Sequence, residues 1–144
     1  MTATEKVHVG WREWLSLPDL DIAQIKAKVD TGARTSCIHA LDIEEYTEQG
    51  ETWVKFYTHP VQENEDVRVE CHAKVKKRKF VTSSSGQKEL RYFIETTLGA
   101  GGKSWPIEIT LSNRSTMKFR MLLGRTAMEN RLVVDPALSY LLNS

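Results

Sequence analysis

Alternating apolar and polar residues run through most of this chain, and this period of two restricts its fold more than any other feature. Side chains of a β-strand point alternately to opposite faces of a sheet, so such stretches indicate strands buried on one face. Turn-forming clusters separate them, such as Glu-Gln-Gly-Glu at 48–51 and Gly-Ala-Gly-Gly at 99–102. Short strands with regular turns favour a closed barrel or a sandwich. We expect strands over residues 7–15, 22–29, 52–59, 67–81, 89–98, 105–111, 117–124 and 131–135.

Helical turns are expected in two stretches at most. These are ALDIEEY at 40–46 and RTAMEN at 125–130, the second of which directly follows a glycine. A chain of 144 residues with 40% hydrophobic content has the size of one domain with a modest core. We therefore predict a single, mainly β (all-β) domain over residues 1–144.

The overall charge and the cysteine content exclude several protein classes. The net charge is +1, which gives no reason to expect a nucleic-acid or membrane partner. No apolar run approaches the roughly 18 residues that cross a bilayer, and the N-terminus does not resemble a signal peptide. Two cysteines, Cys37 and Cys71, fit no disulfide framework of a small secreted domain. We expect a cytoplasmic protein with free thiols.

The balanced total hides a basic segment in the middle of the chain. Residues 42–66 hold eight acids and one base, whereas residues 68–91 hold eight bases and two acids. In KVKKRKF at 74–80, alternation places Lys74, Lys76 and Arg78 on one strand face and Val75, Lys77 and Lys79 on the other. A strand that is basic on both faces has little core to cover. We expect it to project as a hairpin, with its tip at 83–86 and its return arm at 90–94.

The stretch VDTGAR at 29–34 allows two interpretations. Asp30, Thr31 and Gly32 follow an apolar strand and could form a simple tight turn, because Asp and Gly are common turn residues. They could equally form half of an acid–base site. About ninety residues later, FRMLLGR at 119–125 is an apolar strand that ends in Gly-Arg.

VDTGA, the following Ser36 and Ile38, and the later LLGR together resemble the two halves of a retropepsin-type aspartic protease subunit. The resemblance covers roughly residues 20–135. It implies a closed barrel of the acid-protease type, with the basic hairpin in the place of the flap and one short C-terminal helix that begins at Gly-Arg. It also implies that Asp30 is catalytic, that Thr31 and Gly32 shape its loop, and that Arg125 braces the dimer or that loop.

Peptide hydrolysis by carboxylates needs two of them sharing one proton. This chain has a single Asp-Thr-Gly, and Asp135 is followed by proline, so it cannot form the same turn. The second aspartate should therefore come from a second copy, which predicts a homodimer with the site at its interface. Thr31 would hydrogen-bond across the two-fold axis, and Gly32 would let the backbone approach the partner carboxylate.

Basic residues around this loop predict an acidic substrate. Arg34, next to Ala33, could bind a substrate carboxylate as a bidentate fork. With Lys76, Arg78 and Lys79 on the flap, Ala33 and Arg34 form the substrate-binding set that we expect. The alternative is that Arg34 forms a structural ion pair and that the lysines form a solvated strand edge.

This chain resembles one bacterial branch of the family more closely than it resembles the family as a whole. KVDTGARTSCIHA, the Trp-Pro-Ile-Glu strand at 105–108 and FRMLLGR resemble the RimK-associated, RimB-like proteins often labelled ATP-dependent zinc proteases. This resemblance implies a cytoplasmic hydrolase linked to RimK, a ligase that adds glutamates to a small-subunit ribosomal protein, and a role in trimming those glutamates. The alternatives are a non-catalytic module that binds the ribosome or the ligase, and a zinc-dependent hydrolase.

We expect neither a metal nor another cofactor. The chain contains no His-Glu-x-x-His, and Cys71 and His72 are neighbours on a strand, so they point to opposite faces. Cys37 and His39 could face the same way, but two ligands do not make a site. The stretch GAGGKS at 99–104 has Thr97 where a phosphate loop needs its first glycine, and it links two strands. It predicts a hairpin turn.

Overall fold

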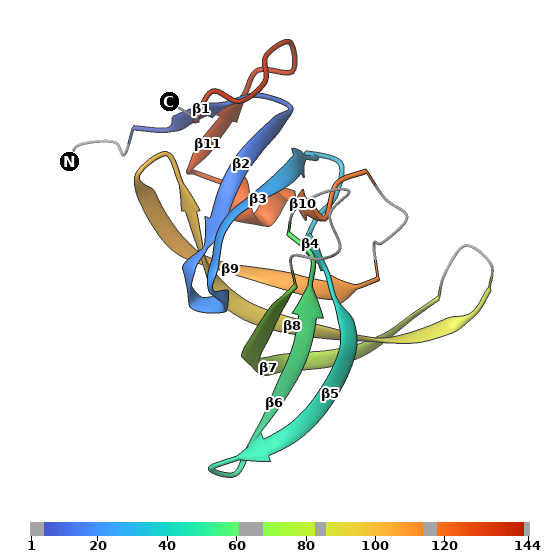
Figure 1. Ribbon diagram of the computed structural model, residues 1–144. Coiled ribbons are helices and arrows are strands. Elements are labelled where there is room, and N and C mark those ends of the chain that lie inside the picture. The colour runs from blue at the N-terminus through green and yellow to red at the C-terminus, as the bar shows by residue number, and fades with distance from the viewer. Residues whose placement is uncertain (1–4, 61–67, 83–85, 114–117, 143–144) are drawn as a thin grey trace.

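The computed structural model describes residues 5–60, 68–82, 86–113 and 118–142 and is built almost entirely of strands (Figure 1). The strands are β1 (Val7–Val9), β2 (Arg12–Leu17), β3 (Ile22–Val29), β4 (Ser36–His39), β5 (Leu41–Glu48), β6 (Glu51–Thr58), β7 (Val69–Thr82), β8 (Lys88–Ala100), β9 (Lys103–Ser112), β10 (Met121–Leu123) and β11 (Leu132–Val134). A 3-10 turn spans Pro18–Leu20, and a short helix, α1, spans Arg125–Met128. Within the described residues, neither helix is long and apolar enough to cross a membrane.

Six strands close into a barrel. Within the described chain, neighbours pair in the order β2-β3-β10-β4-β9-β8, and β8 pairs back with β2 at Ser16 and Gly99. The closure brings these two backbones so close that a side chain at Gly99 would collide with the Ser16 hydroxyl. The predicted mainly β, closed-barrel fold with one short helix near the C-terminus is therefore confirmed.

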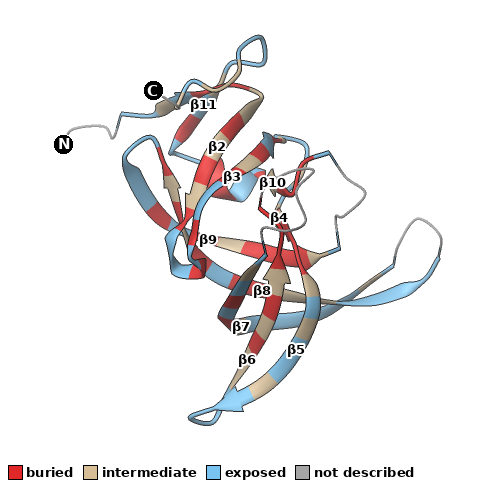
Figure 2. Cartoon of the chain, viewed as in Figure 1, coloured by how far each residue is buried: buried red, intermediate tan, exposed pale blue. Residues whose placement is uncertain are grey.

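The barrel interior is the core of the molecule. Buried positions recur along the barrel strands (Figure 2), and most of them are apolar. The fully buried set includes Leu17, Ile22, Ile25, Ile38, Ile94, Leu98, Ile109, Leu111, Met121 and Leu123. Burying a side chain of this size contributes roughly 1.5–3 kcal/mol, so this interior supplies most of the driving force for folding.

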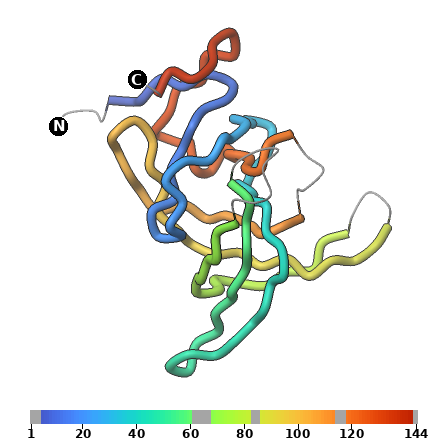
Figure 3. Tube along the Cα trace, in the orientation of Figure 1, coloured from blue at the N-terminus to red at the C-terminus, as the bar shows by residue number. Residues whose placement is uncertain are grey.

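Strands β7, β6 and β5 continue the sheet beyond β8 and form an arm outside the barrel (Figure 3). Val54 and Phe56 of β6 are buried, and so are Cys71 and Ala73 of β7. The prediction of helical turns at 40–46 is wrong, because residues 41–46 lie in β5, which pairs with β6. The turn between the two strands has φ of +53° at Gln49 and +76° at Gly50, as a two-residue hairpin of this kind requires.

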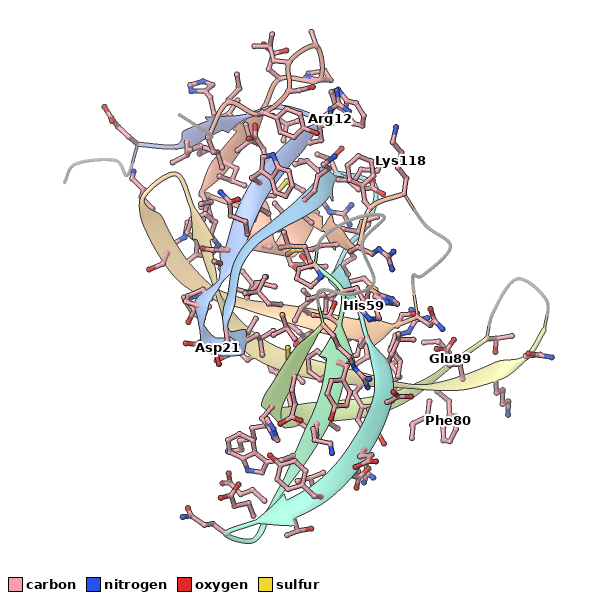
Figure 4. All side chains as sticks on the ribbon, in the orientation of Figure 1. Arg12, Asp21, His59, Phe80, Glu89 and Lys118 are labelled. Atoms are coloured by element: carbon pink, nitrogen blue, oxygen red, sulfur yellow. The ribbon has the colours of Figure 1, made fainter. Side chains whose placement is uncertain are left out.

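The outer parts of β7 and β8 form the projecting basic hairpin that we expected. Lys79 pairs with Arg91 and Thr82 with Lys88, while the expected tip at 83–85 lies outside the described residues. Figure 4 shows Phe80 and Glu89 on this hairpin, well away from the barrel. Phe80 is 68% exposed, so the hairpin buries little apolar surface of its own.

The expected strand at 7–15 is divided between two sheets. β1 pairs in parallel with β11, whereas β2 enters the barrel. The division falls at Gly10 and Trp11: the Gly10 N–H donates to the buried Glu13 carboxylate (2.6 Å), and the Trp11 N–H donates to the Leu138 carbonyl (2.9 Å). The hairpin turn predicted at GAGGKS is confirmed, since Ala100 pairs with Lys103 across Gly101 and Gly102, both with positive φ.

Candidate active site

The loop that carries Asp30 is positioned by a strand from the far end of the chain. β10 lies between β3 and β4, parallel to the first and antiparallel to the second. Residues 30–35 connect β3 to β4, so they must pass around the end of β10. The VDTG and LLGR stretches, about ninety residues apart, therefore meet at one point of the barrel.

Hydrogen bonds hold the Asp30 main chain, and one of them orients its carboxylate. The Asp30 N–H donates to the Leu123 carbonyl at 2.9 Å, and the Gly32 N–H donates to the carboxylate Oδ1 at 2.9 Å. The Ala33 N–H closes the turn on the Asp30 carbonyl at 3.2 Å. A Cβ at Gly32 would lie 3.2 Å from the same Oδ1, so a side chain there would crowd the carboxylate. Gly32 thus leaves the Asp30 carboxylate in the orientation that its N–H binds.

The start of α1 holds the other side of the loop. The Arg125 N–H donates to the Ala33 carbonyl (2.7 Å) and the Thr126 N–H to the Arg34 carbonyl (3.0 Å). The Arg125 guanidinium donates to the Thr31 carbonyl at 2.8 Å. Arg125 therefore braces the loop, and the Thr31 and Gly32 residues between these anchors remain exposed.

Gly124 packs directly against the loop backbone. A Cβ at this position would lie 2.5 Å from the Thr35 carbonyl carbon and 2.8 Å from the Ser36 nitrogen. The Gly124 N–H also donates to the buried Ser36 hydroxyl at 2.9 Å. The glycine of LLGR is therefore required by close approach of two backbones.

A cationic pocket lies beside the loop. It encloses about 320 Å³ and is lined by Arg34, Thr35, Lys77, Lys79, Phe93, Glu108 and Thr126. Arg34 comes from the Asp30 loop, whereas Lys77 and Lys79 come from the hairpin. Arg34 and Lys79, both expected to bind substrate, thus meet in one pocket.

Of the other three expected substrate-binding residues, Ala33 holds the loop through its main chain, and Arg78 and Lys76 lie outside the pocket lining and form ion pairs. The Arg78 guanidinium contacts both Glu45 oxygens at 3.0 Å, on the face of the hairpin opposite to Lys79. Lys76 contacts Glu108 at 3.1 Å and Glu95 at 3.7 Å. A bulge between Val75 and Lys77 breaks the expected alternation, so Lys76 and Lys77 both reach Glu108.

Lys77, Glu108 and Phe93 are pocket residues that we did not anticipate. The Lys77 ammonium lies 4.8 Å from the centre of the Phe93 ring. The pairing of β7 with β8 and of β8 with β9 brings these three together. The sequence signal that was available is the isolated acid in the apolar strand Trp-Pro-Ile-Glu-Ile, since Ile107 and Ile109 on either side are buried.

The residues considered for zinc do not gather into one site, although His39 lies beside His59, with ring centroids 5.7 Å apart. Cys71 is buried and His72 exposed, as neighbours on a strand should be. His72 instead contacts Tyr46 (3.0 Å) and Glu70 (2.9 Å), and the hydrogen bond from His72 lowers the pKa of Glu70. Among the described residues, no three His, Cys, Asp or Glu side chains are grouped to hold a metal. These side chains do not fit a zinc site, and we derive no step through a metal.

Comparison with known proteins agrees with this geometry. The family model described as the retropepsin-like aspartic endopeptidase RimB matches residues 8–144. The chain belongs to the RimB-like family of retropepsin-like aspartic endopeptidases. Membership supports a hydrolase.

Curated relatives of this RimB-like chain are much longer. A probable alpha-L-glutamate ligase of Shewanella pealeana is 45% identical over 137 residues, which are 95% of this chain and 30% of that protein. One from Desulfotalea psychrophila is 48% identical over 130 residues, 90% of this chain and 28% of the relative. The chain thus spans less than a third of the length of these relatives.

A solved structure shares the fold. The crystal structure of Lpg0085, a Legionella pneumophila protein of unknown function, aligns with a TM-score of 0.79 and 24% identity. The alignment covers 96% of this chain and 100% of that one. At this identity the likeness supports the fold alone.

Proposed function

We propose that the protein is an aspartic peptidase that trims glutamate-rich tails, with Asp30 from two copies forming the catalytic pair. The observation that carries this proposal is the Asp30 loop, tied to β10 and α1 and holding one carboxylate on a fixed turn. Because the chain supplies one such aspartate, the second would come from a partner copy in a homodimer. The exposed Thr31 and Gly32 leave room for that copy at the loop.

Each carboxylate would have a defined role. The ionised Asp30 takes a proton from water as the water oxygen attacks the peptide carbonyl, while the protonated Asp30 of the other copy gives its proton to the carbonyl oxygen. In the second step the C–N bond breaks, and the departing nitrogen takes the proton that the first carboxylate gained from water. One hydroxyl of the tetrahedral intermediate returns its proton to the second carboxylate as the product carboxyl group forms, so the pair again shares one proton. Oδ1 is already bound by the Gly32 N–H, and no described residue bonds Oδ2, which is the oxygen that would act on water.

Two observations support a substrate rich in glutamate. Arg34, Lys77 and Lys79 line the pocket beside the loop. The curated relatives carry a domain like this one within proteins named as probable alpha-L-glutamate ligases. A peptidase that works beside such a ligase would meet the chains that the ligase extends. By the family resemblance, we propose a RimK-type ligase as partner and a small-subunit ribosomal protein as the carrier of the tail, in the cytoplasm.

The test is hydrolysis of a peptide that ends in several glutamates, at neutral and mildly acidic pH. Wild type, wild type with a zinc chelator, Asp30→Asn and Asp135→Asn are compared. We expect glutamate release that survives the chelator, persists in Asp135→Asn and disappears in Asp30→Asn. Sedimentation under assay conditions should show a dimer. Activity that survives in Asp30→Asn would overturn the aspartic mechanism, and activity lost to the chelator would favour a zinc hydrolase.

One observation favours a second candidate, a non-catalytic module that binds the ligase or the ribosome. Relatives carry this domain as less than a third of a longer protein, which suits an accessory role. On this alternative, Asp30→Asn would leave tail length on the carrier protein unchanged in cells, whereas charge reversal at Lys79 would alter it.

A further inference from the structure

The pocket beside the Asp30 loop contains one carboxylate of its own, that of Glu108. Glu108 lies on β9 between two buried isoleucines, so its side chain points outward from the barrel wall. It is directly opposite Glu95 on β8. Its side chain is 24% exposed, the least of the ion-paired groups around the pocket.

The two oxygens of Glu108 contact different lysines. Oε2 lies 3.1 Å from the Lys76 ammonium, and Oε1 lies 3.7 Å from the Lys77 ammonium. Lys77 is further held over the Phe93 ring, and the hydrogen bond to Glu108 raises the pKa of Lys76. The protein thus already places one glutamate carboxylate between two lysines.

The other side of the pocket is open. Arg34 and Lys79 have no carboxylate within ion-pair distance among the described residues, although both line the same cavity as Glu108. The pocket therefore has two sides. On one side Lys77 is already paired with Glu108, and on the other Arg34 and Lys79 have no carboxylate partner among the described residues. Its volume of about 320 Å³ lies at the lower end of ligand pockets, roughly 300–1,000 Å³.

We propose that Glu108 is a specificity-determining residue: it occupies the Lys77 side of the pocket, so that the pocket admits one substrate carboxylate, between Arg34 and Lys79. A second carboxylate beside the first would meet the negative charge of Glu108 and find no free cation, and such built-in repulsion is a common source of specificity. The proposal rests on the acidic substrate proposed above and adds the number of carboxylates that the pocket accepts.

Replacing Glu108 by glutamine separates this role from a simple change in charge. Glu108→Gln keeps the shape of the side chain and releases Lys77. A peptide with two adjacent glutamates should then bind about tenfold tighter, because a second charge-assisted contact becomes available. A peptide with one glutamate should bind within about threefold of the unaltered affinity.

The matched control is Glu44→Gln. Glu44 also pairs with a lysine, Lys55 at 3.3 Å, but on the arm and outside the pocket, and its replacement changes the net charge equally. It should leave both affinities unchanged. Lys79→Met should weaken the one-glutamate peptide about tenfold, whereas Lys77→Met should weaken it less than about threefold because Lys77 is already paired.

Binding of the peptides is measured by fluorescence anisotropy. Every variant is made in the full chain that also carries Asp30→Asn, so that the peptides are not hydrolysed. A peptide with glutamine in place of glutamate is the neutral reference. The proposal for Glu108 would be overturned if Glu108→Gln raised the affinity for both acidic peptides equally, or if Glu44→Gln raised it as well. Equal losses of affinity in Lys77→Met and Lys79→Met would also overturn it, and so would failure of both acidic peptides to bind. If Glu108→Gln does not fold, the two lysine variants still decide. Hydrolysis is assayed separately with the pocket variants in the chain that keeps Asp30. Selective binding without any cleavage would overturn the peptidase proposal alone. Cleavage that none of the pocket substitutions changes would overturn the proposal for Glu108 alone.

Discussion

The Asp30 loop and the basic hairpin lie on either side of the same pocket, yet they are held in opposite ways. The loop is fixed by main-chain hydrogen bonds to residues about ninety positions away and by backbone contact at Gly124. The hairpin is fixed by its own ladder and by ion pairs of exposed side chains, such as Arg78 with Glu45. The geometry of the Asp30 loop thus depends on packing that salt does not change, while the hairpin depends in part on surface charges that salt screens.

The largest effect should come from Gly124→Ala. The added methyl group would lie 2.5 Å from the Thr35 carbonyl carbon, and neither backbone can move without disturbing β10 or β4. Overpacking of this kind costs roughly 1–3 kcal/mol or more. We expect a lowered free energy of unfolding in urea and loss of the hydrolysis proposed above.

Gly50→Ala is the control for that substitution. Gly50 has positive φ, but no atom lies within 4 Å of the position its Cβ would take. The backbone strain should cost about 1 kcal/mol and leave hydrolysis unchanged. If both variants lost equal amounts of stability and activity, packing would hold the Asp30 loop no more tightly than it holds a surface turn.

The next largest effect is expected for Glu13→Gln. The buried Glu13 carboxylate accepts hydrogen bonds from the N–H groups of Gly10, Leu141 and Leu142, at 2.6, 2.8 and 3.0 Å. A glutamine would turn an N–H₂ donor toward one of these donors, at a cost of about 2 kcal/mol. Urea unfolding should show this loss, and limited proteolysis should cut the C-terminal segment 135–142 sooner. A cost no greater than that of the exposed Glu44→Gln would contradict the prediction.

The parts of the molecule that could be predicted are those encoded locally. Alternation and turn residues predicted the strands at 22–29, 52–59 and 105–111, and the basic hairpin followed from a strand with no apolar face. Resemblance to a known family paired VDTG with LLGR. The structure then supplied the physical reason, because β10 fills the gap between β3 and β4.

The parts that could not be predicted depend on partners distant in sequence. Glu44 and Glu45 favour a helix locally, but pairing with β6 through a two-residue turn makes this segment a strand. Nothing in KVKKRKF marks the bulge after Val75, which directs Lys77 to Glu108. Glu13 shares the inward face of β2 with Leu15 and Leu17, and nothing local shows that a carboxylate at this position finds its partners in the C-terminal segment.

A smaller effect, at most about 1.4 kcal/mol in the first pH unit above the ordinary thiol pKa, should appear as a pH dependence of stability. Burial raises the pKa of the Cys71 thiol to about 12. Above the ordinary thiol pKa of about 8.5 the unfolded chain loses this proton and the folded chain keeps it, so stability falls as pH rises toward 12, by at most about 1.4 kcal/mol per pH unit. Wild type should lose more stability between neutral and alkaline pH than Cys71→Ala does, and Cys37→Ala should follow wild type. Parallel curves for wild type and Cys71→Ala would show that the thiol ionises equally in both states.

The smallest effect belongs to the hairpin itself. Arg78→Met removes two 3.0 Å contacts with Glu45, but the Arg78 side chain is 49% exposed, and exposed ion pairs contribute about 0–1 kcal/mol. The loss should be measurable in urea unfolding at about 0.1 M salt and should vanish at about 1 M, where the Debye length falls from about 10 to about 3 Å. Gly124→Ala, in contrast, should cost the same at both salt concentrations. A loss of stability in Arg78→Met that persisted at high salt would mean that packing holds the hairpin, as it holds the Asp30 loop. Charge alone would then not explain how the hairpin selects the proposed substrate.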